Sequence, residues 1–301
     1  MKRILFALIA LTAMASVSAQ EIQIYRNNRL IETYTNTANE HYTVKFTDVG
    51  NLDKINGHEF VLINGLKWAT MNVGATTVAE SKETAYGDFY AWGEIATYYT
   101  KCPTDTGKVT SWKGNNTESH IPGKTFSHNW KCYSGGNNFH EWDPKPYDDN
   151  NILKPEYDVA RKSWGGTWRI PTQKDFINLI NACGGYGIKQ LPTGTTEPTI
   201  TEGGIYWVPA GTIIDTFQYD VSGFLFVSTV DPNNRVFFPA AGNIQNIKRS
   251  SVATLCTYWS SNIDKTDSPN AHNLYISSTN GITRNSIHSR CNGYSIRPVS
   301  D

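Results

Sequence analysis

The sequence has no excess of either charge, with 27 basic residues against 27 acidic ones. A balanced chain has no extended positive field, which argues against nucleic acid and anionic membranes as partners. Beyond residue 20 it also lacks any apolar run long enough to cross a bilayer. These absences predict a protein with no nucleic-acid partner and no membrane span.

Recognisable catalytic motifs are missing as well. The sequence contains neither a G-x-S-x-G nucleophile elbow nor an H-E-x-x-H metal-binding helix. The pair Gly165-Gly166 has no lysine after it where a phosphate-binding loop needs one. We find no constellation of catalytic residues, which favours a non-catalytic protein. An enzyme of unknown type is the alternative.

Cysteine is scarce and odd in number. The five residues are Cys102, Cys132, Cys183, Cys256 and Cys291, so at least one thiol is unpaired. No two of them lie close together, which disfavours a zinc site. We expect the disulfides Cys102–Cys132 and Cys256–Cys291, each closing a loop-rich segment. Cys183 lies on the apolar face of a predicted helix, and we expect a buried free thiol there.

What is present begins with an export signal. Lys2 and Arg3 precede an apolar run from Ile4 to Ala15, and the small residues Val17-Ser18-Ala19 form a cleavage site. Residues 1–19 are therefore predicted to be a secretory signal peptide. The protein is expected to be exported, either secreted or held at the outer cell surface.

Residues 20–49 are predicted to form a small N-terminal β extension. Two strands flank Asn27-Asn28, a dipeptide that favours a hairpin turn. Tyr42, Val44 and Phe46 alternate with polar residues, which predicts a third strand. The segment is short and polar, and it could instead pair with the main sheet.

The strongest helix signal follows the segment Ser163–Thr172, which reads SWGGTWRIPT. Thr172 is a predicted N-cap, with Asp175 three residues later as in a capping box. The next residues place apolar side chains at helical spacing, and Gly184-Gly185 end the pattern. We expect a helix of about a dozen residues with one buried face.

Elsewhere the pattern predicts many short strands. Runs around Asn64-Gly65 and around Asp231–Asn234 have the form strand, turn, strand. Further strands are expected at Thr257–Asn262, Ala271–Ser277 and Tyr294–Val299. Two segments show little periodicity and are predicted to be insertions, at residues 95–150 and 187–219, the second at the surface.

Six words of sequence carry a family resemblance. In chain order they are LKWATMNVGA, YGDFYAWGE, WGGTWRIPT, FFPAAG, YWSSN and the C-terminal GYSIRPV. Together they resemble the Fibrobacter succinogenes major paralogous domain, which is frequent in exported proteins of Bacteroidetes. The resemblance covers residues 57–301, apart from the two insertions.

That family is similar in fold to C-type lectin-like domains and to formylglycine-generating enzymes. The resemblance implies an α+β fold, with a C-type-lectin-like core of short antiparallel strands, one or two helices and long ordered loops. It also implies adhesion or glycan recognition, with a glycan or a host or cell-surface protein as partner. The alternatives are a structural subunit of a surface or fimbrial assembly and an enzyme on the formylglycine-generating fold. The closely spaced cysteines of that enzyme are absent here.

Sugar binding without metal uses exposed aromatic faces beside fixed amide groups. The first insertion is rich in aromatic, asparagine and glycine residues. We predict a ligand-binding surface there, formed by Trp112, Trp130, Tyr133 and Trp142. Packing within an ordered loop is the alternative.

Calcium is the one cofactor that the sequence leaves open. Hard cations take several oxygen ligands, and Asp264, Asp267 and Asn270 fall in one loop after YWSSN. The Trp-Asn-Asp word of calcium-binding lectins is missing, however. A solvated polar loop without a cofactor is the alternative.

Five residues of the family words are interpreted as structural. Trp164, Trp168 and Trp259 are expected in the core, because large aromatic side chains dominate the packing of such cores. Arg169 and Arg297 lie in strand-like contexts and are expected to be buried in hydrogen-bonded pairs with carboxylates.

Overall fold

The computed structural model describes residues 20–26, 29–36, 54–95, 146–191, 198–245, 248–265, 270–290 and 292–301. The chain divides into two units, Met1–Val49 and Gly50–Asp301. In the first unit, β1 (Gln20–Arg26) and β2 (Arg29–Asn36) form an antiparallel pair, so the predicted hairpin is confirmed. The predicted signal peptide and the predicted strand at residues 42–46 lie outside the described residues.

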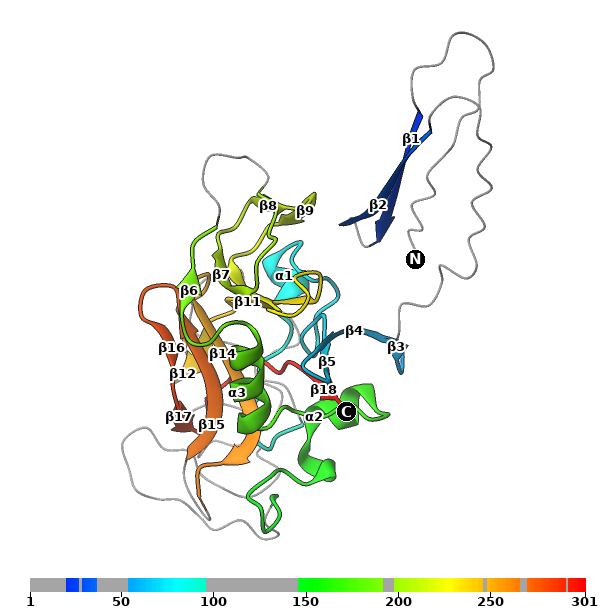
Figure 1. Ribbon diagram of the computed structural model, residues 1–301. Coiled ribbons are helices and arrows are strands. Elements are labelled where there is room, and N and C mark those ends of the chain that lie inside the picture. The colour runs from blue at the N-terminus through cyan, green and yellow to red at the C-terminus, as the bar shows by residue number, and fades with distance from the viewer. Residues whose placement is uncertain are drawn as a thin grey trace. The chain divides into compact units, whose positions relative to one another are not determined.

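The second unit is mostly β-sheet with few helices, which is compatible with the α+β class (Figure 1). Its helices are α1 (Lys82–Ala85), α2 (Val159–Trp164), α3 (Gln173–Ala182) and the 3₁₀ turn η1 (Pro155–Tyr157). Its strands are β3 (Lys54–Ile55), β4 (His58–Ile63), β5 (Leu66–Ala69), β6 (Ile188–Lys189), β7 (Gly204–Val208), β8 (Thr212–Ile214), β9 (Phe217–Tyr219), β10 (Gly223–Val227), β11 (Arg235–Pro239), β12 (Asn243–Gln245), β13 (Lys248–Ser250), β14 (Leu255–Ile263), β15 (Asn270–Ser277), β16 (Gly281–Thr283), β17 (Ile287–Ser289) and β18 (Val299–Ser300).

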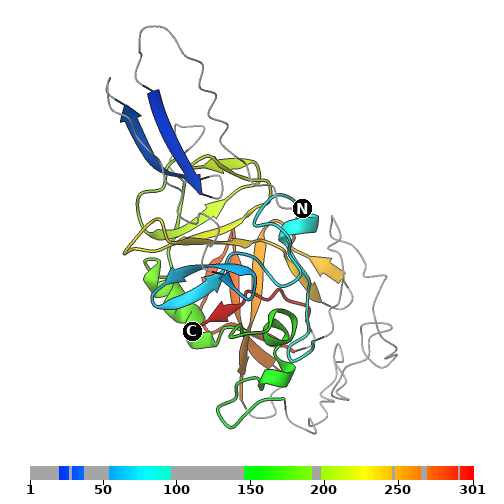
Figure 2. The same ribbon diagram turned by 90° about the vertical axis from the view of Figure 1, so that its right-hand side faces the viewer.

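The described residues of the second unit form three four-stranded sheets. Their strand orders are β18-β5-β4-β3, β11-β10-β7-β6, and β14-β15-β16 with β17 also on β15. Two small pairs, β8-β9 and β12-β13, complete the pattern. Figure 2 shows the C-terminal β18, in red, beside the blue β4 and β5. The last strand of the chain therefore closes the sheet that the first strands of this unit begin.

The helix α3 follows from its local sequence. The Thr172 hydroxyl accepts a hydrogen bond from the Asp175 N–H at 3.1 Å, and the Asp175 carboxylate accepts one from the Thr172 N–H at 2.7 Å. The predicted capping box is thus confirmed. Phe176, Leu179 and Ile180 are buried on one face. Positive φ angles at Gly184 and Gly185 follow the end of the helix.

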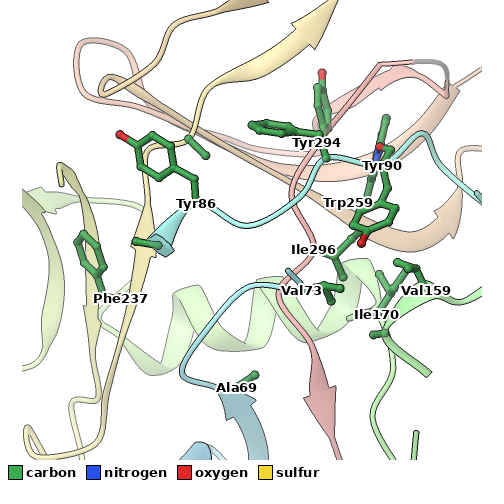
Figure 3. Packing of buried hydrophobic residues seen from close by; sticks show 14 of the residues in the cluster. Ala69, Val73, Tyr86, Tyr90, Val159, Ile170, Phe237, Trp259, Tyr294 and Ile296 are labelled. Atoms are coloured by element: carbon green, nitrogen blue, oxygen red, sulfur yellow. The ribbon is translucent and has the colours of Figure 1, made fainter. Parts of the chain in front are cut away.

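The sheet β11-β10-β7-β6 lies between two hydrophobic clusters. Along β10, Leu225 packs into one cluster while Phe224 and Phe226 pack into the other. Figure 3 shows the first cluster, which also gathers side chains such as Phe237 and Trp259 from distant parts of the chain. Both faces of this sheet are covered at β10 and β7, so these two strands are core elements.

One prediction of a surface insertion needs correction. Within the segment 187–219, β7 is an inner strand between β6 and β10, and four of its five residues are buried. The sequence of β7, GIYWV, gives no period-two signal because apolar residues point to both covered faces. The other predicted insertion, residues 95–150, lies largely outside the described residues.

Candidate functional site

The predicted ligand-binding residues Trp112, Trp130, Tyr133 and Trp142 lie outside the described residues. The residues that flank their segment are described, however. Trp92 and Tyr147 are buried, and their ring centroids lie 6.4 Å apart. The Trp92 indole N–H donates to the Ser260 carbonyl at 2.8 Å, which fixes this point on β14. The described residues on either side of the segment 96–145 therefore meet at one fixed place in the core.

The predicted calcium loop is described only in part, since Asp267 lies outside the described residues. The Asp264 N–H donates to the Asn270 carbonyl at 3.1 Å. The Asp264 carboxylate lies 3.9 Å from Nε2 of His272, whose pKa is lowered chiefly by burial. Within the described part of the chain, no group of three His, Cys, Asp or Glu side chains is arranged to hold a metal ion.

The predicted disulfide Cys256–Cys291 is wrong, because the Cys256 thiol is free and buried. The thiol points into the core and donates to the carbonyls of Phe238 and Pro239, at 3.2 and 3.3 Å. Burial raises its pKa well above the usual range, so it stays a neutral thiol. Cys183 is also free and buried, and burial raises its pKa to about 12. The predicted partners Cys102 and Cys132 lie outside the described residues.

Arg169 is bound by two carboxylates, as expected. Its guanidinium lies 2.7 Å from Asp175 and 2.8 Å from Asp301. Burial would lower the pKa of Arg169, but the hydrogen bonds to Asp301 and Asp175 outweigh it and raise the pKa. The same contact lowers the pKa of Asp301. Because Asp175 also caps α3, these ion pairs join the start of that helix to Asp301, the residue that follows β18.

Arg297 is fully buried, but carbonyl groups take the place of the expected carboxylate. Its two Nη atoms donate to the carbonyls of Ala69 and Phe237, at 2.9 and 2.8 Å. Its guanidinium carbon also lies 4.8 Å from the centroid of the Phe238 ring. Burial lowers the pKa of Arg297, while the neighbouring Tyr258 acts in the opposite direction. The prediction of a carboxylate partner is therefore wrong, since backbone acceptors and a ring face hold this cation.

The three tryptophans that were interpreted as structural lie in the core. Trp168 and Trp259 are fully buried and Trp164 is 7% exposed. The indole N–H groups of Trp168 and Trp259 donate to the carbonyls of Ile55 and Tyr90, each at 2.8 Å. The His58 ring stacks on Trp164 with centroids 3.6 Å apart. These side chains are occupied in packing and in holding neighbouring segments.

The structure brings together a polar cluster that sequence reasoning missed. β17 pairs with β15, and Asn273, Ser286 and His288 meet there. The Ser286 hydroxyl donates to the Asn273 side-chain oxygen at 2.9 Å, and the Asn273 amide nitrogen lies 3.1 Å from Nδ1 of His288. Tyr275 stacks on His288 with centroids 5.4 Å apart. The available signal was the alternation Ser286-Ile287-His288, which runs from the residue before β17 into the strand and places two polar side chains on one face.

Among the described residues, no helix is long and apolar enough to cross a membrane. Comparison of the chain with protein-family models, with curated proteins and with solved structures finds no significant match.

Proposed function

We propose that this chain is an exported binding protein, secreted or at the cell surface, that recognises glycans. It would do so on a C-type-lectin-like core of the major paralogous domain family. The family words supply buried residues, which supports the view that these words are architectural and that recognition is left to the segments between them. Those buried residues include Trp68, Trp92, Trp168, Phe238, Trp259 and Arg297.

The contact between Trp92 and Tyr147 is the observation that carries the proposal. It holds the two flanks of the segment 96–145 together at the core, with ring centroids 6.4 Å apart. Long loops whose ends are close together on a rigid scaffold are common places for recognition. The residues offered from this segment are Trp112, Trp130, Tyr133 and Trp142, whose ring faces suit sugar rings.

A glycan array tests this proposal. We expect saturable retention of the secreted protein on a subset of glycans. The variants Trp112→Ala, Trp130→Ala and Trp142→Ala should reduce retention at least tenfold, about the effect of losing one good contact. Val230→Ala is the control, because Val230 is 93% exposed in the β10–β11 turn and lies outside the segment. A chelator arm separates calcium-dependent retention from metal-independent retention. No retention on any glycan would refute the proposal.

A structural subunit of a surface assembly is the second candidate, and the β1–β2 hairpin favours it. In the described part of the chain, neither strand pairs with a third one. Each therefore has an edge that can accept another strand. This candidate expects oligomers in analytical ultracentrifugation that disappear when residues 20–49 are removed, with no signal on the glycan array.

A further inference from the structure

The cluster on β15 and β17 has a closed inner layer. Asn273 is 7% exposed and Ser286 is 5% exposed, so their polar atoms need partners inside the protein. The Asn273 N–H also donates to the Ser286 carbonyl at 3.0 Å, which fixes the two segments against each other. The side-chain hydrogen bonds of this pair thus hold a defined geometry.

This inner layer determines which nitrogen of His288 carries the proton. Nδ1 of His288 lies 3.1 Å from the Asn273 amide nitrogen and 3.3 Å from the Ser286 hydroxyl oxygen. The hydroxyl donates its proton to Asn273, and an amide nitrogen can only donate, so we infer that Nδ1 accepts from Asn273. Burial lowers the pKa of His288, and the neutral ring then carries its single proton on Nε2. His288 therefore presents an Nε2–H donor on the side of the ring away from the buried pair.

A rigid aromatic base lies beside the ring. Tyr294 is fully buried and stacks on Trp259, with centroids 4.2 Å apart. Its ring meets that of His288 edge-on at 5.8 Å, and the Asn292 amide donates to its hydroxyl at 3.3 Å. His288 is thus held by Tyr294 on one side and by the stacked Tyr275 on another.

Two polar groups of the cluster can form hydrogen bonds to a ligand. Within the described residues, neither Nε2 of His288 nor the hydroxyl of Tyr275 has a hydrogen-bond partner, and neither atom is among the fully buried ones. Both side chains are half-buried, so each has one polar end at the surface. A fixed donor on one ring and a hydroxyl group on the ring that stacks on it form a preorganised arrangement for hydrogen bonding to a ligand.

We propose that Tyr275 and His288, supported by Asn273 and Ser286, form a metal-independent site for a neutral pyranose sugar. This inference rests on the proposed glycan recognition, but it places a sugar contact on the β15–β17 sheet rather than in the segment 96–145. The site would use the Nε2–H of His288 and the Tyr275 hydroxyl to bind sugar hydroxyl groups. The ring faces of the cluster would border the apolar side of the sugar.

The uncharged character of the cluster favours a neutral sugar over an acidic one. Its four members are two side chains with hydroxyl groups, one amide and one neutral imidazole. A carboxylate or sulfate group is bound best by charged donors such as arginine and lysine. The hydroxyl groups of a neutral hexose can form hydrogen bonds with these uncharged side chains, and no opposite charge is needed to bind them.

Nuclear magnetic resonance on ¹⁵N-histidine-labelled full-length protein tests the site directly. We expect His288 to show the neutral Nε2–H tautomer, and its signals to shift when methyl glycosides of neutral hexoses are titrated in. Tyr275→Phe removes one hydroxyl and keeps the ring, and should weaken the association about tenfold. His288→Phe should do the same while keeping the stacked pair. His58→Gln is the matched control, because His58 is also half-buried with a lowered pKa but lies on β4.

The outcomes separate this site from the proposed function. Glycan retention that persists in Tyr275→Phe and His288→Phe, with both variants folded, overturns the site and leaves the function standing. The Nδ1–H tautomer, or a preference for sialylated or sulfated glycans, also overturns the site. A wild-type protein that binds no glycan at all, with no shift of His288, overturns both.

Discussion

Arg169 and Arg297 show how one residue type is stabilised in two ways within a single core. Arg169 is partly buried and retains two carboxylate partners, at 2.7 and 2.8 Å. Arg297 is fully buried and donates to the carbonyls of Ala69 and Phe237. Each carbonyl belongs to a different sheet, so Arg297 joins β5 to β11 by hydrogen bonds that an ion pair with a single carboxylate would not provide.

Gly242, the last residue of the word FFPAAG, gives a prediction at the residue scale. Its φ is +75°, and a Cβ atom there would clash with the carbonyl oxygen of Ser250. Gly211 has a similar φ of +82° but has no heavy atom within 4 Å of a Cβ at that position. Gly211→Ala should cost about 1 kcal/mol of unfolding free energy, from the positive φ alone.

Gly242→Ala should cost about 2–4 kcal/mol, because overpacking adds to the strained φ. Urea unfolding of both variants measures the difference, and the shared backbone conformation makes Gly211→Ala the matched control. Equal losses for the two glycines would show that close approach of the chain is not what FFPAAG requires at this position.

At the scale of the element, the cap of α3 is the clearest case of local sequence determining structure. Thr172→Ala removes the hydroxyl that accepts from the Asp175 N–H, and should cost about 1 kcal/mol of unfolding free energy. Thr172→Ser keeps that acceptor and should stay within about 0.5 kcal/mol of the wild type. Chemical denaturation measures both values. A Thr172→Ala variant as stable as Thr172→Ser would contradict the capping role.

Elements with local signals were predictable, and elements defined by distant partners were not. The hairpin of β4 and β5 follows from Asn64-Gly65, whose φ angles are both positive. By contrast, a strand was expected at Tyr294–Val299, yet only Val299 of these residues belongs to a strand, as the first residue of β18 on β5. Tyr294 and Ser295 make single bridges to segments far away in the sequence, and no local pattern records such partners.

The same reason limits prediction of the candidate site. The interpretation of Trp168 and Trp259 as core residues needs only their size and context. The link from Ser286 to Asn273 and His288 depends on the register between β15 and β17, which a single sequence does not specify. The predicted disulfide at Cys256 was wrong for the same reason, since only the fold shows that this thiol faces the Phe238 and Pro239 carbonyls.

At the scale of the whole molecule, three half-buried histidines should make stability depend on pH. Burial lowers the pKa of His58, His272 and His288 from the ordinary value of 6.5. Below pH 6.5 the unfolded chain then binds more protons at these sites than the folded chain does. The free energy of unfolding should therefore be highest above pH 6.5, and should fall as the pH drops through the lowered pKa values.

Two carboxyl groups act on stability in opposite directions. Burial raises the pKa of Asp158 from 3.8, so its contribution is lost as the pH rises from 3.8 through that raised value. Hydrogen bonding to Arg169 lowers the pKa of Asp301, so its contribution is lost as the pH falls below 3.8. Urea unfolding between about pH 8 and pH 5 covers the ordinary titration range of histidine. Both carboxyl groups remain in a variant that lacks the three histidines, so comparing that variant with the wild type separates the histidine contribution from theirs.

The comparison that decides this last prediction is between the wild type and the triple variant His58→Gln, His272→Gln, His288→Gln. The wild type should lose stability steadily below pH 6.5, the ordinary histidine pKa. The triple variant should show a much flatter profile, because glutamine has no titrating ring and the remaining histidines are common to both proteins. Parallel profiles for the two proteins would mean that these three imidazole rings do not determine the acid sensitivity. In that case other titrating groups of the chain would determine the acid sensitivity, and the unfolding data would not support the neutral state assigned to His288.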